Sequence, residues 1–138
     1  MRTVVVTLFL LFASATGASA GLVDRVDVSK QTMTVSENGQ VVHSWRVSTG
    51  RKGYNTPRGS YRPTRMHRMW YSRKYDNSPM PYSVFFRGGY AVHGTSYVKQ
   101  LGRPASHGCV RLATGNARTF YNLVRAAGSS NTRIVLQR

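Results

Sequence analysis

The sequence predicts a mainly β domain with one helix, and three features of the chain lead to this fold class. Apolar and polar residues alternate from Leu22 to Val42, which is typical of half-buried strands. Two glycine-containing turns each separate a pair of such segments. A single stretch after residue 113 carries apolar residues at helical spacing. We therefore expect a domain that opens with antiparallel strands and closes with a helix and a strand.

The first predicted turn is Asn38-Gly39. Both residues tolerate the positive φ angles of a type I′ turn, so the segments on either side should form a hairpin. After Gly50, glycine and proline interrupt regular structure as far as Gly59, which indicates a loop. A further strand is predicted from Ser60 to Thr64.

The second predicted hairpin joins Tyr82–Phe86 to Tyr90–Gly94 through the turn Arg87-Gly88-Gly89. This places His93 at the C-terminal end of a buried strand. The helix is predicted from Ala117, Phe120, Tyr121 and Val124, with Thr114 as N-cap and Gly128 just beyond its end. A last strand should span Thr132–Gln137.

Residues 1–20 have the pattern of a secretory signal peptide. Arg2 precedes an apolar run from Val4 to Phe12, and Ala18-Ser19-Ala20 forms a small-residue cleavage site. The apolar run is shorter than the roughly 20 residues that span a bilayer, and no second hydrophobic segment follows. We expect an exported protein of the periplasm or cell wall, with residues 21–138 as one domain and no transmembrane segment after cleavage.

The chain is strongly basic, with 20 Lys and Arg against 4 Asp and Glu and a net charge of +16. Loss of Arg2 with the signal peptide would leave +15. The basic residues between Arg51 and Lys74 alternate with aromatic ones and include no acid. Such a region can bind nucleic acid, but the chain has no recognisable nucleic-acid motif, so a solvated basic lip around a groove is favoured. Export favours anionic envelope polymers as partners instead of nucleic acid.

Cys109 is the only cysteine, in the segment "ASHGCVRL". In an oxidising compartment one cysteine cannot form a disulfide within its own chain. Three interpretations follow: a reactive nucleophile, a metal ligand, or an inert apolar residue. A metal site would use Cys109 with His107, His93 and perhaps His67, but the chain lacks the paired spacing of zinc ligands, so no metal is expected.

The nucleophile interpretation requires a base or cation that promotes thiolate formation, and donors for the oxyanion. Arg111 should project from the same strand face as Cys109, and Gly108 leaves space for a substrate. His107 is adjacent in sequence and His93 ends a neighbouring strand. The residues alone leave both histidines open as the base.

The segment "HGTSYVKQLGRPASHGCVRL" resembles the signature of the L,D-transpeptidases, the YkuD-type catalytic domain. The upstream segment "STGRKGYNTPRGSY" is similar to that family's Thr-Pro-x-Gly-x-aromatic segment, and "VSKQTMTVSENGQVV" to its opening hairpin. The resemblance covers nearly all of residues 21–138. The loop between His93 and Ser106 is short for the family, which predicts a smaller substrate lid.

The resemblance implies a β-sandwich of mixed sheets with one short helix after the cysteine. It implies that Cys109 is the nucleophile and His93 the general base and later acid. No carboxylate lies near His93 in sequence, so a backbone carbonyl, that of Gly94 in the family, is expected to orient it.

The remaining site residues also take their roles from the resemblance. Ser106 and His107 would shape the site, and the backbone amides around Gly108 and Cys109 would form the oxyanion hole. Arg111 would orient the cysteine loop or bind a carboxylate of the substrate.

The function implied by the resemblance is acyl transfer on peptidoglycan stem peptides, with a thioester intermediate, loss of D-alanine, and no metal or organic cofactor. An amine acceptor gives a cross-link, whereas water gives L,D-carboxypeptidase activity. Two other classes remain as alternatives: a non-catalytic basic module that binds the cell envelope, and a secreted nucleic-acid binder.

Overall fold

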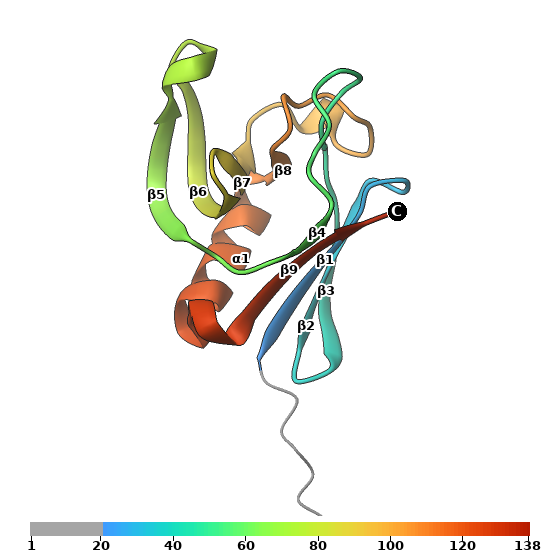
Figure 1. The fold of residues 1–138 in the computed structure, drawn as a ribbon, viewed down its shortest axis with the longest axis vertical. Helices are drawn as coiled ribbons and strands as arrows, with labels where there is room; N and C mark the ends of the chain where they lie inside the picture. Colours follow the sequence, from blue (N-terminus) through green and yellow to red (C-terminus); the bar gives the residue numbers. More distant parts are fainter. Residues whose placement is uncertain (1–20) are drawn as a thin grey trace, which may run out of the picture.

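The structure, a computed structural model, describes residues 21–138, which form two sheets and one α-helix (Figure 1). Sheet A contains, in spatial order, β3 (Gln40–Arg46), β2 (Thr32–Glu37), β1 (Leu22–Asp27), β9 (Thr132–Gln137) and β4 (Gly59–Tyr61). Sheet B contains β5 (Arg65–Ser72), β6 (Ser78–Arg87), β7 (Tyr90–Thr95) and β8 (Val110–Ala113). The predicted signal peptide, residues 1–20, lies outside the described residues.

Both sheets are mixed. In sheet A, β1 and β9 run parallel with Leu22 opposite Thr132, and in sheet B, β7 and β8 run parallel with His93 opposite Arg111. The remaining neighbours are antiparallel. The prediction of a mainly β fold of mixed sheets with one helix is confirmed.

The two predicted glycine turns are present. Asn38 and Gly39 have φ angles of 49° and 82°, as a type I′ turn requires, and Gly88 has a φ of 49° between β6 and β7. The turn between β1 and β2 was not predicted. It places Gln31 at a φ of 53°, and the buried Gln31 side chain supports the loop of the candidate site.

The sheet B strands carry a different apolar cluster on each face because successive side chains of a strand point to opposite sides. On the inner face, Val84 and Val92 pack with sheet A and the helix in the main core. On the outer face, Phe85 and Ala91 belong to a smaller cluster that Cys109 packs against. The same alternation that buries the main core therefore places the odd-numbered residues of β7 and β8 on the outer face.

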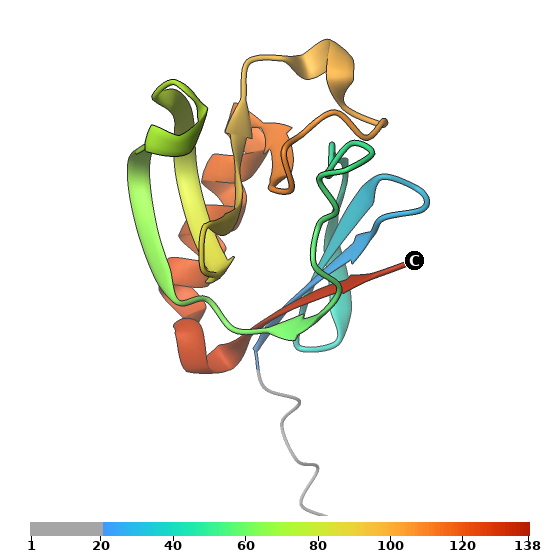
Figure 2. The same ribbon diagram turned by 45° about the horizontal axis from the view of Figure 1, so that its top comes forward.

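Helix α1 (Thr114–Ala127) packs against β6, β7 and β8 and reaches β1, so it lies between the two sheets (Figures 1 and 2). Its buried residues are those predicted from helical spacing, Ala117, Phe120, Tyr121 and Val124. Gly128 follows the helix at a φ of 86°, also as predicted.

The predicted N-cap is wrong. Thr114 is the first helical residue and Ala113 occupies the N-cap position without a side-chain hydrogen bond. The hydroxyl of Thr114 donates instead to the carbonyl of Thr95, at 3.3 Å, so it ties the helix start to the end of β7.

The strands around the basic region also differ from the prediction. β4 ends at Tyr61 instead of Thr64, and β5 occupies residues 65–72, where no strand was expected. It pairs with a β6 that begins at Ser78, ahead of the predicted Tyr82. The tip of this hairpin, a 3₁₀ turn at Arg73–Tyr75, lies at the same end of the molecule as the loop between β7 and β8 (Figures 1 and 2).

The length and hydropathy of α1 do not suit a bilayer, and within residues 21–138 no other helix is long and apolar enough to cross a membrane.

Candidate active site

The loop that carries Cys109 is fastened to the segment that follows β3. Ser48 and Arg111 exchange backbone hydrogen bonds of 3.0 and 2.9 Å, and the amide of Ser106 donates to the carbonyl of Thr49 at 2.9 Å. These bonds join the edge of sheet A to β8 at the edge of sheet B. The position of Cys109 is thus set by two sheets and not by its own loop alone.

Sequence reasoning missed the support beneath this segment. The buried carboxamide of Gln31 donates to the hydroxyl of Thr49 at 2.6 Å and accepts from the backbone amide of Thr49 at 2.9 Å. Both residues lie in segments that had been read only as a hairpin and a loop. Their bond joins positions 18 residues apart, a separation that leaves no periodic signal in the sequence.

Ser106 closes the tight turn before the cysteine. Its hydroxyl donates to the carbonyl of Cys109 at 2.6 Å and accepts from the amide of Gly108 at 3.0 Å. Gly108 has a φ of 119°, and a Cβ there would lie 2.5 Å from a ring carbon of Tyr90. Since the Gly108 amide is already bonded, the amide of Cys109 is the better donor for an oxyanion.

Cys109 lies immediately before β8 and not within it. The thiol faces the outer side of sheet B, where its Sγ lies 3.8 Å from the carbonyl oxygen of Gly89. Burial raises the pKa of the Cys109 thiol, a shift that the amide environment at Ala91 and the charge of Arg111 oppose without cancelling.

His93 is buried on β7, one strand away from the cysteine loop. Its Nδ1 lies 2.7 Å from the carbonyl oxygen of Gly94, as expected from the sequence. A carbonyl can only accept, so Nδ1 carries the proton and Nε2 is the free acceptor. Burial lowers the pKa of His93 to about 4, although the bond to Gly94 raises it and the charge of Arg111 lowers it further.

The opposite shifts define the resting state of the pair. A thiol with a raised pKa and an imidazole with a pKa of about 4 are both neutral near pH 7. The arrangement therefore suits proton transfer from Cys109 to His93 during attack instead of a preformed thiolate–imidazolium pair.

A cavity of about 750 Å³ opens over this pair. It brings together Cys109, His93, His107 and Arg111, four of the residues singled out in the sequence. The predicted residues Ser106, Gly108 and Gly94 do not line it and instead support the lining from behind. Its other walls come from the β5–β6 hairpin and from the loop after β7, including Lys74, Tyr75, Ser96 and Tyr97.

His107 is part of an aromatic wall. Its ring stacks on that of Tyr75 with centroids 4.1 Å apart and 14° between the planes, and Tyr54 meets it edge-on at 4.9 Å. Burial, then Arg51, Arg111 and Lys74, lower the pKa of His107. These contacts suit a residue that joins the hairpin tip to the cysteine loop, whereas His93 has the oriented nitrogen that a base requires.

Arg111 combines two functions at the cavity floor. Its backbone is bonded to Ser48, and its guanidinium donates to the side-chain oxygen of Gln100 at 3.3 Å. The side chain is partly buried. Burial lowers the pKa of Arg111, which the nearby Cys109 and Tyr97 counteract.

The candidate metal ligands do not gather at one place. His67 lies on β5, where its Nε2 is 3.0 Å from the guanidinium of Arg65 and its ring contacts Trp70. It does not line the cavity around Cys109. Across residues 21–138, no group of three or more His, Cys, Asp or Glu side chains is arranged to hold a metal ion.

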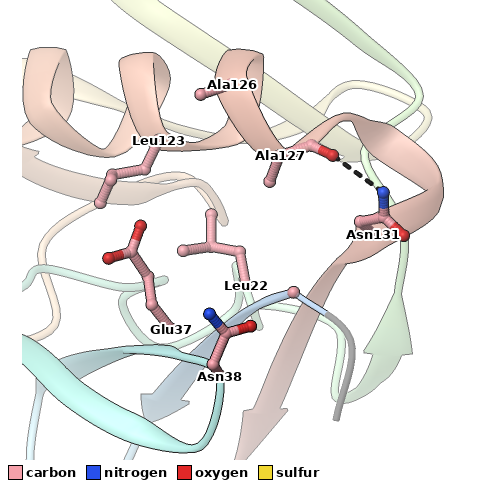
Figure 3. A pocket seen from close by; sticks show the side chains of 8 residues that line it. Leu22, Glu37, Asn38, Leu123, Ala126, Ala127 and Asn131 are labelled. Carbon is pink, nitrogen blue, oxygen red and sulfur yellow. Dashed lines mark hydrogen bonds between the residues drawn. The ribbon is translucent and has the colours of Figure 1, made fainter. Parts of the chain in front are cut away.

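A second cavity, of about 510 Å³, lies where β1 meets the last turn of α1 (Figure 3). The side chains of Leu22, Leu123 and Glu37 point into it, and Asn131 donates to the carbonyl of Ala127 at 3.0 Å (Figure 3). It contains no nucleophile and no histidine. We therefore assign the candidate active site to the cavity at Cys109.

Comparison with known structures supports this assignment. A structure titled as an L,D-transpeptidase from Xylanimonas cellulosilytica is 32% identical, with a TM-score of 0.73 over 87% of this chain. Structures titled as L,D-transpeptidases from Stackebrandtia nassauensis and Mycobacterium tuberculosis are 26% and 27% identical, with TM-scores of 0.76 and 0.77 over 92% and 86% of this chain. The chain covers only 58% to 62% of the length of these three structures.

A comparison with curated proteins gave no match. The model of one protein family, described as the L,D-transpeptidase catalytic domain (YkuD), matches residues 24–135. This match includes every residue of the cavity and nearly the whole of both sheets. The chain therefore belongs to the family of L,D-transpeptidase catalytic domains.

Proposed function

We propose that this protein is an exported cysteine L,D-transpeptidase that acts on peptidoglycan stem peptides. The observation that supports this most directly is the juxtaposition of Cys109 and His93 at one cavity, with the Nδ1 proton of His93 bonded to Gly94. This bond leaves Nε2 as the acceptor for the thiol proton.

The proposed reaction proceeds in two acyl transfers. Cys109 Sγ attacks the carbonyl before the terminal D-alanine of a tetrapeptide stem while His93 Nε2 takes the thiol proton. The oxyanion binds the amide of Cys109, and D-alanine leaves after protonation by the His93 imidazolium. An amine of a second stem then attacks the thioester, loses its proton to His93 and releases the Cys109 thiol.

The charge of the chain suits the proposed location. The net charge of +16 favours adsorption to anionic polymers of the envelope. The predicted signal peptide would deliver the domain there, with cleavage after Ala20 as part of this proposal.

The test is intact-protein mass spectrometry after incubation with a tetrapeptide stem. We expect a mass increase that equals the stem minus D-alanine, located at Cys109 and absent from the Cys109→Ala variant. Subsequent addition of a second stem should yield a cross-linked peptide, whereas release of a tripeptide alone would identify a carboxypeptidase. Equal turnover by wild type and Cys109→Ala would disprove the cysteine mechanism.

A further inference from the structure

The cavity at Cys109 is lined by positive charge without a compensating acid. Lys74 and Arg111 both line it, and no Asp or Glu side chain does. Of the four acidic residues, Asp24 is buried in the core, Asp27 and Glu37 lie on sheet A, and Asp76 lies at the hairpin tip outside the lining. An anion that enters this cavity therefore meets no repulsive carboxylate.

The Arg111 guanidinium has unused hydrogen-bonding capacity. It has five N–H donors in a planar fork, and in the described part of the chain the only side-chain partner is Gln100. Burying part of a cation beside a second cation, Arg51, is unfavourable unless an anion compensates it. A carboxylate bound to the free side of the fork would do so in a bidentate geometry.

Lys74 lies on a different wall of the same cavity. It belongs to the hairpin tip, where its Nζ is 5.5 Å from the centre of the Tyr75 ring. Tyr75 in turn stacks on His107, so the contacts of the tip extend to the cysteine loop. Lys74, Arg51 and Arg111 all lie near enough to His107 to act on its charge. The cations thus converge on one region beside the nucleophile.

We propose that Lys74 and Arg111 form a two-point carboxylate site that selects acyl donors with free carboxylates over donors in which these groups are carboxamides. The inference rests on the proposed function and adds a substrate class to it. Arg111 binds one carboxylate through its fork, and Lys74 acts as a point charge for a second carboxylate of the same stem. A carboxamide has no charge to offer either cation, so an amidated stem loses both interactions.

The experiment compares two synthetic tetrapeptide stems that differ only in amidation of the diaminopimelate carboxyl group. The readout is kcat/KM for thioester formation at Cys109 by mass spectrometry. Wild type should prefer the free carboxylate by roughly tenfold or more. Lys74→Gln should lower kcat/KM for that donor by about fivefold, the upper range for an exposed pair, and should leave the amidated donor unchanged.

Arg73→Gln is the matched control because Arg73 belongs to the same 3₁₀ turn but does not line the cavity. It removes the same charge and should leave the preference intact. Equal loss in Arg73→Gln and Lys74→Gln would reduce the effect to net charge and overturn the site, as would an unchanged preference in Lys74→Gln.

Binding of the same peptides to Cys109→Ala, measured by calorimetry, separates this inference from the reaction. Tighter binding of the free carboxylate supports the site even if no thioester forms. Equal affinity of both peptides overturns it while a thioester in wild type leaves the proposed function standing. Absence of any thioester contradicts the proposed function itself.

Discussion

Asp24 is a carboxyl group in the main core without a hydrogen-bond partner. Its exposed fraction is 0%, and neither carboxylate oxygen is bonded to any group within residues 21–138. Its neighbours Leu22 and Val26 point to the same side of β1 into an apolar cluster. Desolvation raises the pKa of Asp24 well above its ordinary value, since the charged form loses its hydration.

The Asp24 shift predicts a pH dependence of stability. The folded state holds a proton on Asp24 in a pH range where the unfolded chain has already released it, so the free energy of unfolding should fall as pH rises through the folded pKa. The slope should approach about 1.4 kcal/mol per pH unit between the two pKa values. Asp24→Asn cannot titrate and should abolish this slope in denaturant titrations from pH 4 to pH 9.

Asp27→Asn provides the control on the same strand. Asp27 is exposed, and its hydrogen bond with Ser29 lowers its pKa, so it affects stability only at acid pH and with the opposite sign. A slope that persists in Asp24→Asn but disappears in Asp27→Asn would contradict the assignment to the buried carboxyl group.

The pKa of His93 sets the acid limit of the proposed reaction. Because the pKa is about 4, His93 should remain a competent base well below the ordinary value of 6.5. The rate of Cys109 acylation should therefore be constant from neutral pH down to about pH 5 and decline near pH 4. Stopped-flow acylation over pH 3.5–8 measures this, and a decline centred near 6.5 would show that the imidazole is not buried as described.

His93→Gln supplies the comparison for that profile. It should lower the acylation rate by about 10²- to 10⁴-fold, the usual contribution of a general base, and remove the acid limb. An acid limb that survives in His93→Gln would assign the titration to another group.

At the scale of elements, the site depends on the segment between β3 and the loop at Gly50. Thr49 accepts the buried Gln31 amide, and its carbonyl accepts from the amides of Ala105 and Ser106. The β1–β2 turn is therefore coupled to the cysteine loop through three short hydrogen bonds. A disturbance at Gln31 or Thr49 should reach Cys109 without any direct contact to it.

Thr49→Val tests this coupling. The variant keeps the side-chain shape but leaves the buried Gln31 amide with one partner fewer, which should cost roughly 1–3 kcal/mol of unfolding free energy. Acylation at Cys109 should slow while the pH profile keeps its acid limb near 4, as expected of a positioning residue.

The control for Thr49→Val is Thr119→Val on the surface of α1, where the hydroxyl donates to the Gly115 carbonyl. This variant should change the unfolding free energy by less than about 0.5 kcal/mol and leave acylation unchanged. If Thr49→Val behaved like Thr119→Val, the coupling would be absent.

At the scale of the whole molecule, the excess of positive charge predicts how the protein meets its substrate. Binding to an anionic wall polymer should weaken steadily as NaCl rises from 50 to 500 mM, because the Debye length falls from more than 10 Å to a few Å. Cosedimentation with purified polymer measures this. The Cys109→Ala variant should bind equally well, and binding that is insensitive to salt would contradict an electrostatic origin.

The features predicted from the sequence are those with a local signal. The Asn38-Gly39 turn, the α1 core residues and the last strand follow from turn chemistry and periodicity. β5 was missed because its burial depends on tertiary contacts: the Arg65 guanidinium lies 3.5 Å from the centre of the Phe85 ring, across two strands. A basic edge strand of this kind has a composition that resembles a loop.

The candidate site divides in the same way. The chemistry of Cys109 and His93 was indicated by residue type and by family resemblance, and the structure places both at one cavity. The roles of Gln31, Thr49 and Tyr75 were not predicted, since each depends on a contact between segments far apart in sequence. Thr114 shows the converse, as its hydroxyl serves Thr95 and not the helix start that local propensity indicated.

The parallel pairing of β1 with β9 affects how the chain can fold. Leu22 lies beside Thr132 and Val26 beside Leu136, so an interior position of sheet A is filled by the last residues to be synthesised. Ile134 and Leu136 are also part of the main core. Closing so long a loop carries a large entropic cost and favours slow folding. The native core therefore cannot form on the ribosome, and the chain leaves the tunnel still unfolded.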